Sequence, residues 1–302
     1  MIKKFLSYVE ITTKITSVFA FLMTLAYLFY TGRPVNVRLT VIFFAAMFLF
    51  DLTTTAINNY IDTKTNRQQL QFSRSAALVI IYILFALSAA LGLYLAYLTD
   101  IVVLLLGALC FVCGVLYTYG PVPISRQPLG EFFSGSFYGF FIPFLLLYIN
   151  MPRGTYLTLN LRLESITLTL KTAPLLCVFL LALPPFCTTA NIMLANNICD
   201  LQKDAAVGRH TLPYYLGAKI SLYLFAALYY AVYAAVTLMV LLKILHPVCL
   251  LFWLSIIPAQ KNISVFFKKQ EKSETFITSI KNYVIIMGGI SALIFISALI
   301  RV

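Results

Sequence analysis

Charged side chains, and acidic ones above all, are scarce in this sequence of 302 residues. Only 11% of the residues are charged and 61% are hydrophobic, whereas typical soluble domains have about 25% and about 45–50%. Such a chain has too little polar surface to cover a water-facing globule. The same figures exclude intrinsic disorder, collagen and a disulfide-rich miniprotein. At about 20 residues per membrane-spanning helix, the composition predicts an all-α polytopic membrane protein.

Histidine is also rare, since the chain has only His210 and His246. The six cysteines lie almost entirely within apolar runs, and the CxxC pair Cys110 and Cys113 lacks the second pair or nearby histidines of a redox or zinc site. We interpret the cysteines as small apolar packing residues. No Ser-His-Asp or Cys-His arrangement indicates a covalent nucleophile. Glu10 and Lys14 interrupt any signal-peptide core, so no cleaved signal is expected.

Nine apolar runs predict membrane-spanning helices around a central cavity. They cover residues 16–31, 38–59, 75–98, 101–118, 132–149, 173–195, 219–243, 245–260 and 282–300. The eighth run is short, and only Lys243, His246 and Pro247 separate it from the seventh, so a different division of these two runs is the alternative. We expect a single transmembrane domain over residues 1–302.

The basic residues predict the orientation of these helices. A net charge of +12 would suggest nucleic acid for a soluble protein, but in membrane proteins Lys and Arg gather in cytoplasmic loops. Fifteen of the 22 Lys and Arg fall in the N-terminal segment and the alternate loops on its side, and seven fall on the other side. We therefore expect a cytoplasmic N-terminus, an external C-terminus and no nucleic-acid partner.

One external loop has a different pattern. Residues 156–171 read YLTLNLRLESITLTLK and alternate between apolar and polar side chains. A period of two is typical of extended strands, so we predict a small extracellular β-hairpin. An amphipathic surface helix is the alternative.

Acidic and amide side chains gather in two segments that this topology places on the cytoplasmic side. A carboxylate inside a membrane costs about 2.5–3.5 kcal/mol on insertion scales, so the few that are present are informative. In both segments they recur at intervals of four and therefore share one helix face. The first ladder comprises Asn58, Asp62 and Asn66; the second comprises Asn196 or Asn197, Asp200 and Asp204.

These residue types suit a divalent metal that carries a phosphate. Carboxylate and amide oxygens are ligands for Mg²⁺, which keeps several waters and bridges to substrate phosphates. Two ladders that face one another would hold a diphosphate between them. Basic side chains beside the ladders would bind the remaining phosphate oxygens: Lys64, Arg67, Arg126, Lys203 and Arg209. Helix capping or solvation explains a single acid as well, but two ladders on one side favour the metal site.

Three further features adjoin these segments. Gly208 would allow a tight turn before Arg209. Asp51 either orients the first ladder through hydrogen bonds or pairs with a cation. The proline- and glycine-rich segment 117–131 predicts an ordered loop, which brings Tyr117, Tyr119, Arg126 and Glu131 to the same face.

These segments resemble the UbiA-type intramembrane prenyltransferases. The family's second motif, DxxxDxxxGxxT, is intact as Asp200, Asp204, Gly208 and Thr211. Its first motif, NDxxDxxxD, begins at Asn58 and has amides, Asn59 and Asn66, where the family often has aspartates. Within the family, residues 51–60, 117–125 and 196–204 are most similar to 1,4-dihydroxy-2-naphthoate polyprenyltransferases.

The resemblance implies a bacterial plasma-membrane enzyme with its active site near the cytoplasmic face. It would use Mg²⁺ to join a polyprenyl group from polyprenyl diphosphate to an aromatic acceptor, with loss of CO₂ and diphosphate. Another acceptor, such as 4-hydroxybenzoate or haem, is an alternative, and a secondary transporter is a more remote one.

The residues then receive the following expected roles. The metal ligands would be Asn58, Asp62, Asn66, Asn196 or Asn197, Asp200 and Asp204. The diphosphate would contact Asn58, Lys64, Arg67, Lys203 and Arg209. Catalysis would depend on Asp62, Asp200 and Asp204, with Arg126 and Tyr117. The faces of Tyr60, Tyr117 and Tyr119 would shield an allylic cation.

Overall fold

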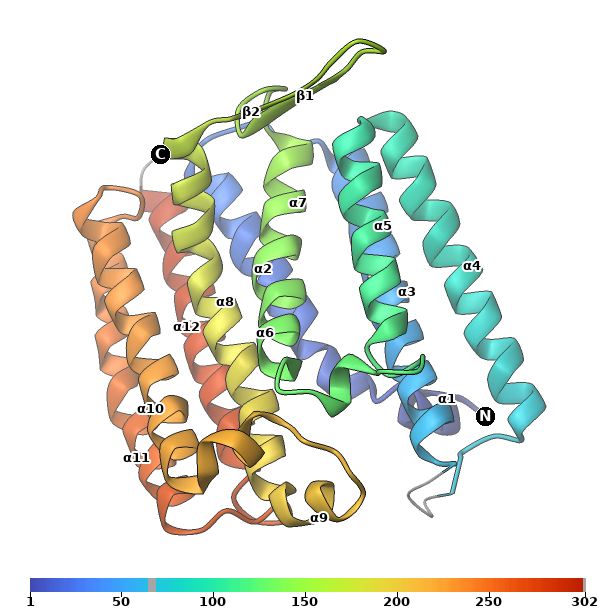
Figure 1. Cartoon of the computed structure of the whole chain (residues 1–302). Helices are drawn as coiled ribbons and strands as arrows, with labels where there is room; N and C mark the ends of the chain where they lie inside the picture. Colours follow the sequence, from blue (N-terminus) through green and yellow to red (C-terminus); the bar gives the residue numbers. More distant parts are fainter. Residues whose placement is uncertain (65–68, 301–302) are drawn as a thin grey trace. The chain divides into compact units, whose positions relative to one another are not determined.

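The computed structural model describes residues 1–64 and 69–300 of the chain. These residues form helices joined by short connections, together with one two-stranded sheet (Figure 1). The chain divides into two compact units. Unit 1 comprises Met1–Val18 and Asn36–Ile124, and unit 2 comprises Phe19–Val35 and Ser125–Val302. The assignment of one domain and a central cavity stays a prediction.

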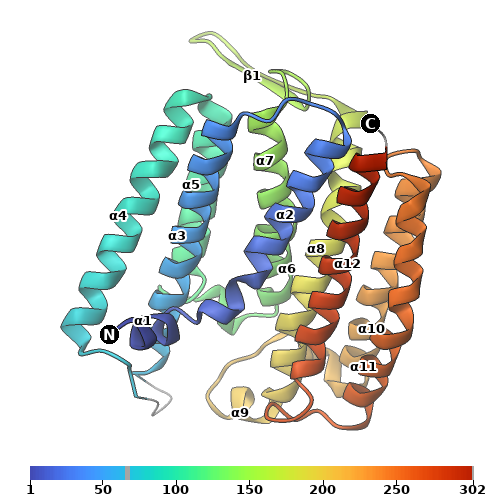
Figure 2. The ribbon, with the colours of Figure 1, turned by 180° about the vertical axis from the view of Figure 1, so that it is seen from behind.

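Unit 1 contains three long helices and the N-terminal segment. Its elements are α1 (Ile2–Tyr8), the 3₁₀ turn η1 (Ile11–Lys14), the first turn of α2 (Ile15–Tyr30), α3 (Val37–Asp62), α4 (Arg74–Leu98) and α5 (Ile101–Leu116). Helices α3 and α4 lie side by side, and α5 contacts both (Figures 1 and 2). Polar side chains begin these helices by accepting backbone N–H groups: Asn36, Ser73 and Asp100.

Unit 2 is organised around α8 (Thr172–Cys199), which contacts most of the other helices of the unit. The helices before it, α6 (Gly130–Gly135), the π-helical turn η3 (Ser136–Phe141) and α7 (Ile142–Asn150), run on from one another. Those after it are α9 (Leu201–Ala206), α10 (Leu212–Leu241), the 3₁₀ helix η4 (Pro247–Ser255), α11 (Ile256–Lys268) and α12 (Ile277–Ile300). Helices α8 and α12 lie side by side (Figure 2). The short 3₁₀ turn η2 (Ile124–Arg126) connects the two units in sequence.

All nine predicted apolar runs are helical. In the described part of the chain, eight helices are long and apolar enough to cross a membrane, and Ile101–Leu116 is a shorter apolar helix. The protein is therefore an all-α, multi-pass membrane protein. The division after the seventh run is confirmed, because α10 ends at Leu241 and Lys243 adopts a positive φ of 59° before η4 begins.

The predicted hairpin is present, and the alternative of a surface helix is wrong. Strand β1 (Leu157–Leu161) pairs antiparallel with β2 (Ile166–Leu170), with Leu157 opposite Leu170. The hairpin joins α7 to α8 (Figure 1). Because side chains alternate between the faces of a strand, this register gathers the leucines and Ile166 on one face and the threonines and Asn160 on the other.

Small residues bring α6 and η3 close to α8. Glu131, Gly135 and Gly139 recur at intervals of four and share one helix face. A Cβ atom on Gly139 would lie 2.2 Å from the backbone nitrogen of Phe186, and one on Gly135 would lie 3.0 Å from the Phe186 carbonyl oxygen. This contact between helices, typical of small-xxx-small motifs in membranes, holds Glu131 against α8.

We expect Gly139→Ala to destabilise the protein, because the added methyl group meets backbone atoms that do not rotate away. Overpacking of this kind costs about 1–3 kcal/mol. Gly107→Ala in α5 is the matched control, since a Cβ atom there meets nothing within 4 Å and Ala stabilises a helix interior by roughly 0.5–1 kcal/mol relative to Gly. Melting temperatures of the purified variants in detergent measure both effects. An unchanged melting temperature for Gly139→Ala would contradict the packing described.

Candidate functional site

The second predicted ladder lies where α8 passes into α9. Helix α8 ends at Cys199 and Asp200 is the junction residue. The helical hydrogen bonds nevertheless continue through it, since the Asp200 N–H bonds to Asn196 O at 3.0 Å and the Asp204 N–H to Asp200 O at 2.8 Å. Asn196, Asp200 and Asp204 therefore follow one another at intervals of one turn. The carboxylates of Asp200 and Asp204 are only 15% and 10% exposed.

Gly208 folds the chain back onto this ladder. It has a φ of +69°, a conformation that glycine adopts at no steric cost. Its N–H bonds to Ala205 O at 3.2 Å, and the Arg209 N–H bonds to Asp204 O at 2.8 Å, which together form a Schellman motif. The Arg209 guanidinium consequently lies 3.8 Å from the Asp204 carboxylate. The tight turn predicted at Gly208 is confirmed.

Three cations gather on the two carboxylates. Lys203 lies 4.0 Å from Asp200 Oδ1, Arg209 pairs with Asp204, and Lys272 donates to Asp200 Oδ2. Lys203 and Arg209 were identified from the sequence. Lys272, in the connection between α11 and α12, was missed, because it lies 72 residues after Asp200 and no local motif marks it.

The segment before α6 packs against the same corner. Arg209 Nε donates to Ser125 O at 3.0 Å, and the His210 N–H donates to Arg126 O at 3.2 Å. The Arg126 side chain is exposed. The His210 ring stacks on Tyr214, with centroids 4.3 Å apart. The loop 125–126 therefore adjoins the turn that carries Arg209.

One of the two neighbouring asparagines of α8 is hydrogen-bonded to α6. Asn197 is 2% exposed, and its Nδ2 donates to Glu131 Oε1 at 2.8 Å, so this amide is directed at α6. Asn196 is half-buried. The second oxygen of Glu131 and the Asn197 carbonyl oxygen are buried and accept no hydrogen bond within residues 1–64 and 69–300. Asn197 thus links α8 to α6, a contact that the sequence did not indicate.

The first ladder ends α3 in unit 1. Asn58 and Asp62 lie on its last two turns and are half-buried. The side-chain oxygen Oδ1 of Asn58 accepts a hydrogen bond from Thr118 Oγ1. Thr118 lies between Tyr117, the residue that follows α5, and the exposed Tyr119. The predicted ligand Asn66 and the predicted phosphate contact Arg67 lie outside the described residues.

Tyr60 is covered by two cations in unit 1. Lys64 Nζ lies 5.0 Å from the centroid of the Tyr60 ring and the Arg74 guanidinium carbon lies 5.1 Å from it. Arg74 also donates to the Tyr60 carbonyl oxygen at 2.6 Å. Cation–π contacts of this length are attractive. They hold Lys64 one turn beyond Tyr60, at the end of the first ladder.

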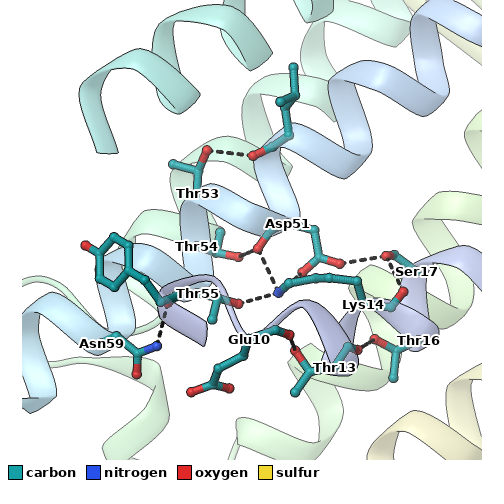
Figure 3. A network of polar contacts seen from close by, with 12 residues as sticks. Glu10, Thr13, Lys14, Thr16, Ser17, Asp51, Thr53, Thr54, Thr55 and Asn59 are labelled. Atoms are coloured by element: carbon teal, nitrogen blue, oxygen red, sulfur yellow. Dashed lines mark hydrogen bonds and ion pairs between the residues drawn. The ribbon is translucent and has the colours of Figure 1, made fainter. Parts of the chain in front are cut away.

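Asp51 pairs with a cation, which was the second of the two alternatives for it. Figure 3 shows Lys14 extended toward Asp51 and Thr55. Lys14 Nζ donates to Asp51 Oδ1 at 2.9 Å and also contacts Thr55 Oγ1. Ser17 Oγ donates to Asp51 Oδ2 at 2.6 Å. The side chains of Lys14 and Asp51 are 3% and 4% exposed, so this is a buried ion pair between the N-terminal segment and α3.

The same face of α3 explains the amide at position 59. Asn59 Nδ2 donates to Tyr8 O at 2.8 Å, and Tyr8 Oη donates to Ala56 O at 2.9 Å. Asp51, Thr55 and Asn59 thus form one row, four residues apart, that binds the segment 8–17 (Figure 3). An ionised aspartate at position 59 has no hydrogen to donate to a carbonyl oxygen.

We therefore expect Asn59→Asp to loosen the N-terminal segment and to lower stability by about 1–3 kcal/mol, the cost of an unsatisfied buried polar group. Asn58→Asp is the matched control: the carboxylate still accepts from Thr118, so stability should change little. Melting temperatures and limited proteolysis of the N-terminus report the difference. Equal stability of the two variants would contradict this role of Asn59.

The donor set of the second ladder fits a metal ion that is shared with a phosphate ligand. Within the described residues, no three His, Cys, Asp or Glu side chains lie together as a metal site. Structural metal cages use such sets, whereas Mg²⁺ is commonly held by one or two carboxylates plus substrate phosphates and waters. Asp200 and Asp204, one turn apart and flanked by Arg209 and two lysines, match the second pattern. The mutual placement of the two ladders stays a prediction.

The sequence matches proteins of known type. Residues 18–280 match the model of the UbiA prenyltransferase family. A 1,4-dihydroxy-2-naphthoate octaprenyltransferase of Bacillus subtilis (strain 168) is 27% identical over 172 residues, which is 57% of this chain. The match spans 49% of that relative, about half of its length.

Solved structures share the fold over nearly the whole chain. The structure of a digeranylgeranylglyceryl phosphate synthase has a TM-score of 0.65 and a sequence identity of 18%. The match covers 99% of this chain and 98% of the synthase chain. A UbiA homolog from Aeropyrum pernix K1 has a TM-score of 0.65 and a sequence identity of 19%, and the match covers 90% of this chain and 96% of the homolog. A UbiA homolog from Archaeoglobus fulgidus, bound to GPP and Mg²⁺, has a TM-score of 0.63 and a sequence identity of 15%, and the match covers 98% of each chain. With the family model matched over most of its length, the chain belongs to the UbiA prenyltransferase family.

Proposed function

We propose that the protein transfers a polyprenyl group from polyprenyl diphosphate to 1,4-dihydroxy-2-naphthoate, with Mg²⁺ as cofactor and loss of the carboxylate as CO₂. The observation that carries the proposal is the pairing of Asp200 and Asp204 with Arg209, Lys203 and Lys272. UbiA homologs from Archaeoglobus fulgidus bound to Mg²⁺ with DMAPP or GPP support the donor half. The naphthoate octaprenyltransferase of Bacillus subtilis supports the acceptor.

In this proposal the two ladders hold the metal. Asp200, Asp204 and Asp62 contribute carboxylates, and Asn196 and Asn58 contribute amide oxygens. Asn196 is preferred to Asn197 because Glu131 already binds the Asn197 amide. When bound, the ion stabilises negative charge on the departing diphosphate.

The basic side chains bind the diphosphate directly. Arg209 is fixed before any ligand arrives, through its backbone bond to Asp204 O and its side-chain bond to Ser125 O. Donors that are already in position stabilise the transition state at little reorganisation cost. Lys203 and Arg126, both exposed, and Lys64 and Arg67 at the end of the first ladder complete the set.

The reaction needs no protein nucleophile. As the allylic C–O bond breaks, its electron pair leaves with the diphosphate, and the electron-rich naphthoate ring attacks the allylic carbon. Loss of CO₂ from the attacked carbon then restores the aromatic ring. The faces of Tyr117 and Tyr119 shield the positive charge that develops on the allyl group, whereas the Tyr60 ring, expected to share this role, is already covered by Lys64 and Arg74.

The membrane accounts for the location of the enzyme. Burial of a hydrocarbon chain gains about 0.8 kcal/mol per CH₂, so a polyprenyl tail stays in lipid while its charged head needs a polar site at a membrane face. Helix ends, where Asp62 and Asp200 lie, provide one. We place this face on the cytoplasmic side of a bacterial plasma membrane, in agreement with the distribution of Lys and Arg.

An acceptor panel tests this proposal. Purified protein in lipid nanodiscs is supplied with radiolabelled polyprenyl diphosphate, Mg²⁺ and, in separate reactions, dihydroxynaphthoate, 4-hydroxybenzoate or haem. We expect a prenylated product with dihydroxynaphthoate. If a product forms only with another acceptor, the acceptor assignment is wrong. If no acceptor gives a product, the assignment as a transferase is wrong. A secondary transporter binds its substrate near the middle of the membrane. The carboxylates of the two ladders lie at helix ends instead, which favours the transferase.

A further inference from the structure

The connection between α11 and α12 is a closed and well-held loop. The Glu271 carbonyl oxygen accepts the N–H groups of Glu274, Thr275 and Phe276 at 3.3, 2.9 and 3.1 Å. The Glu271 N–H in turn donates to Thr275 Oγ1 at 2.9 Å. These bonds fix the backbone on both sides of Lys272, so the position of this lysine is set by the loop.

The charges of this loop are divided unequally. Lys269 Nζ pairs with Glu274 at 2.8 Å and with Glu271 at 3.0 Å, and these carboxylates raise the pKa of Lys269. Lys269 therefore forms ion pairs with the two acids of its own loop. Lys272 instead leaves the loop and donates to Asp200 Oδ2, on the other side from Lys203.

This contact has opposite consequences for a bare metal ion and for a metal diphosphate. A divalent cation alone must displace the Lys272 ammonium from Asp200, so Lys272 opposes its binding. A magnesium diphosphate brings anionic oxygens as well. An ammonium group released from Asp200 then finds a phosphate oxygen as its next acceptor, and hydrogen bonds between charged groups are among the stronger ones.

We propose that Lys272 is a diphosphate-binding residue, which holds Asp200 in the ligand-free protein and moves to a diphosphate oxygen when Asp200 takes up the metal. The inference rests on the proposed function of the Asp200–Asp204 site. It assigns a role to the α11–α12 loop and predicts that metal and diphosphate bind together.

Equilibrium binding tests this role without reference to turnover. Lys272→Ala, Lys272→Gln and Lys272→Arg are compared in nanodiscs with Lys268→Ala, which removes the same charge from the adjacent end of α11. Mn²⁺ binding without diphosphate is followed by electron paramagnetic resonance, and inorganic pyrophosphate binding in excess Mg²⁺ by calorimetry. Melting temperatures identify variants that fold.

Loss of the lysine should change the two affinities in opposite directions. Lys272→Ala and Lys272→Gln should bind pyrophosphate about 10-fold more weakly, as expected for one lost charge-assisted hydrogen bond, and should bind Mn²⁺ alone more tightly. Lys272→Arg and Lys268→Ala should resemble the unmodified protein. Affinities like those of Lys268→Ala, or a parallel loss of both affinities, would overturn the proposal for Lys272. If the unmodified protein binds no pyrophosphate and transfers no prenyl group, the proposed function itself fails.

Discussion

Asp200→Asn should reduce prenyl transfer by on the order of 10³-fold, because a metal ion contributes several kcal/mol to transition-state charge stabilisation and each 1.36 kcal/mol is a factor of ten in rate. The amide preserves the size of the side chain and its place between α8 and α9. It removes the charge that we propose binds the metal and that Lys203 and Lys272 contact. The rate of product formation with saturating Mg²⁺ and polyprenyl diphosphate measures the effect. Asp204→Asn should act similarly, since Asp204 lies one turn further and pairs with Arg209.

Glu164→Gln is the matched control for these two variants. Glu164 is an exposed acid in the turn of the β1–β2 hairpin, so the same loss of charge there should leave the rate unchanged. Full activity of Asp200→Asn would show that this ladder does not hold the metal. An equal loss of activity in all three variants would point to a general effect of charge instead.

Lys14→Ala should strongly destabilise unit 1. It removes one partner of a buried ion pair and leaves the Asp51 carboxylate, to which Ser17 still donates a hydrogen bond, buried without the cation. Breaking such a pair costs about 3–5 kcal/mol. A melting temperature lower by on the order of 10 °C is expected for a protein of this size.

The double variant Lys14→Met/Asp51→Leu distinguishes loss of the pair from loss of packing. When both charges are replaced by apolar groups of similar size, no charge stays buried, and such replacements are often neutral. The double variant should therefore be more stable than Lys14→Ala. If it is less stable, the polar row of Asp51, Thr55 and Asn59 depends on the charges themselves.

Features with a local cause could be predicted from the sequence. The helices follow from long apolar runs, the hairpin from a period of two over residues 156–171, and the turn at Gly208 from a glycine next to a helical segment. The spacing of Asn196, Asp200 and Asp204 also survives the break between α8 and α9, because the hydrogen bonds of the helix continue through Asp200.

Contacts between distant segments could not be predicted. Lys14 lies 37 residues before Asp51, Asn58 lies 60 before Thr118, and Glu131 lies 66 before Asn197. In each case the chemistry of one residue permits several partners, and only the packing of helices selects one. The close approach at Gly139 selects Asn197 for Glu131, and the closed loop 269–276 selects Asp200 for Lys272.

We propose that Mg²⁺ held at Asp200 and Asp204 assists release of diphosphate as the prenyl group is transferred. The direct measurement is the amount of prenylated dihydroxynaphthoate and of released pyrophosphate formed by purified protein in nanodiscs, with Mg²⁺ and with excess EDTA. We expect equal amounts of both products with Mg²⁺, none with EDTA, and recovery when Mg²⁺ is restored. Product formation at the full rate in EDTA would contradict a role for Mg²⁺ in the reaction.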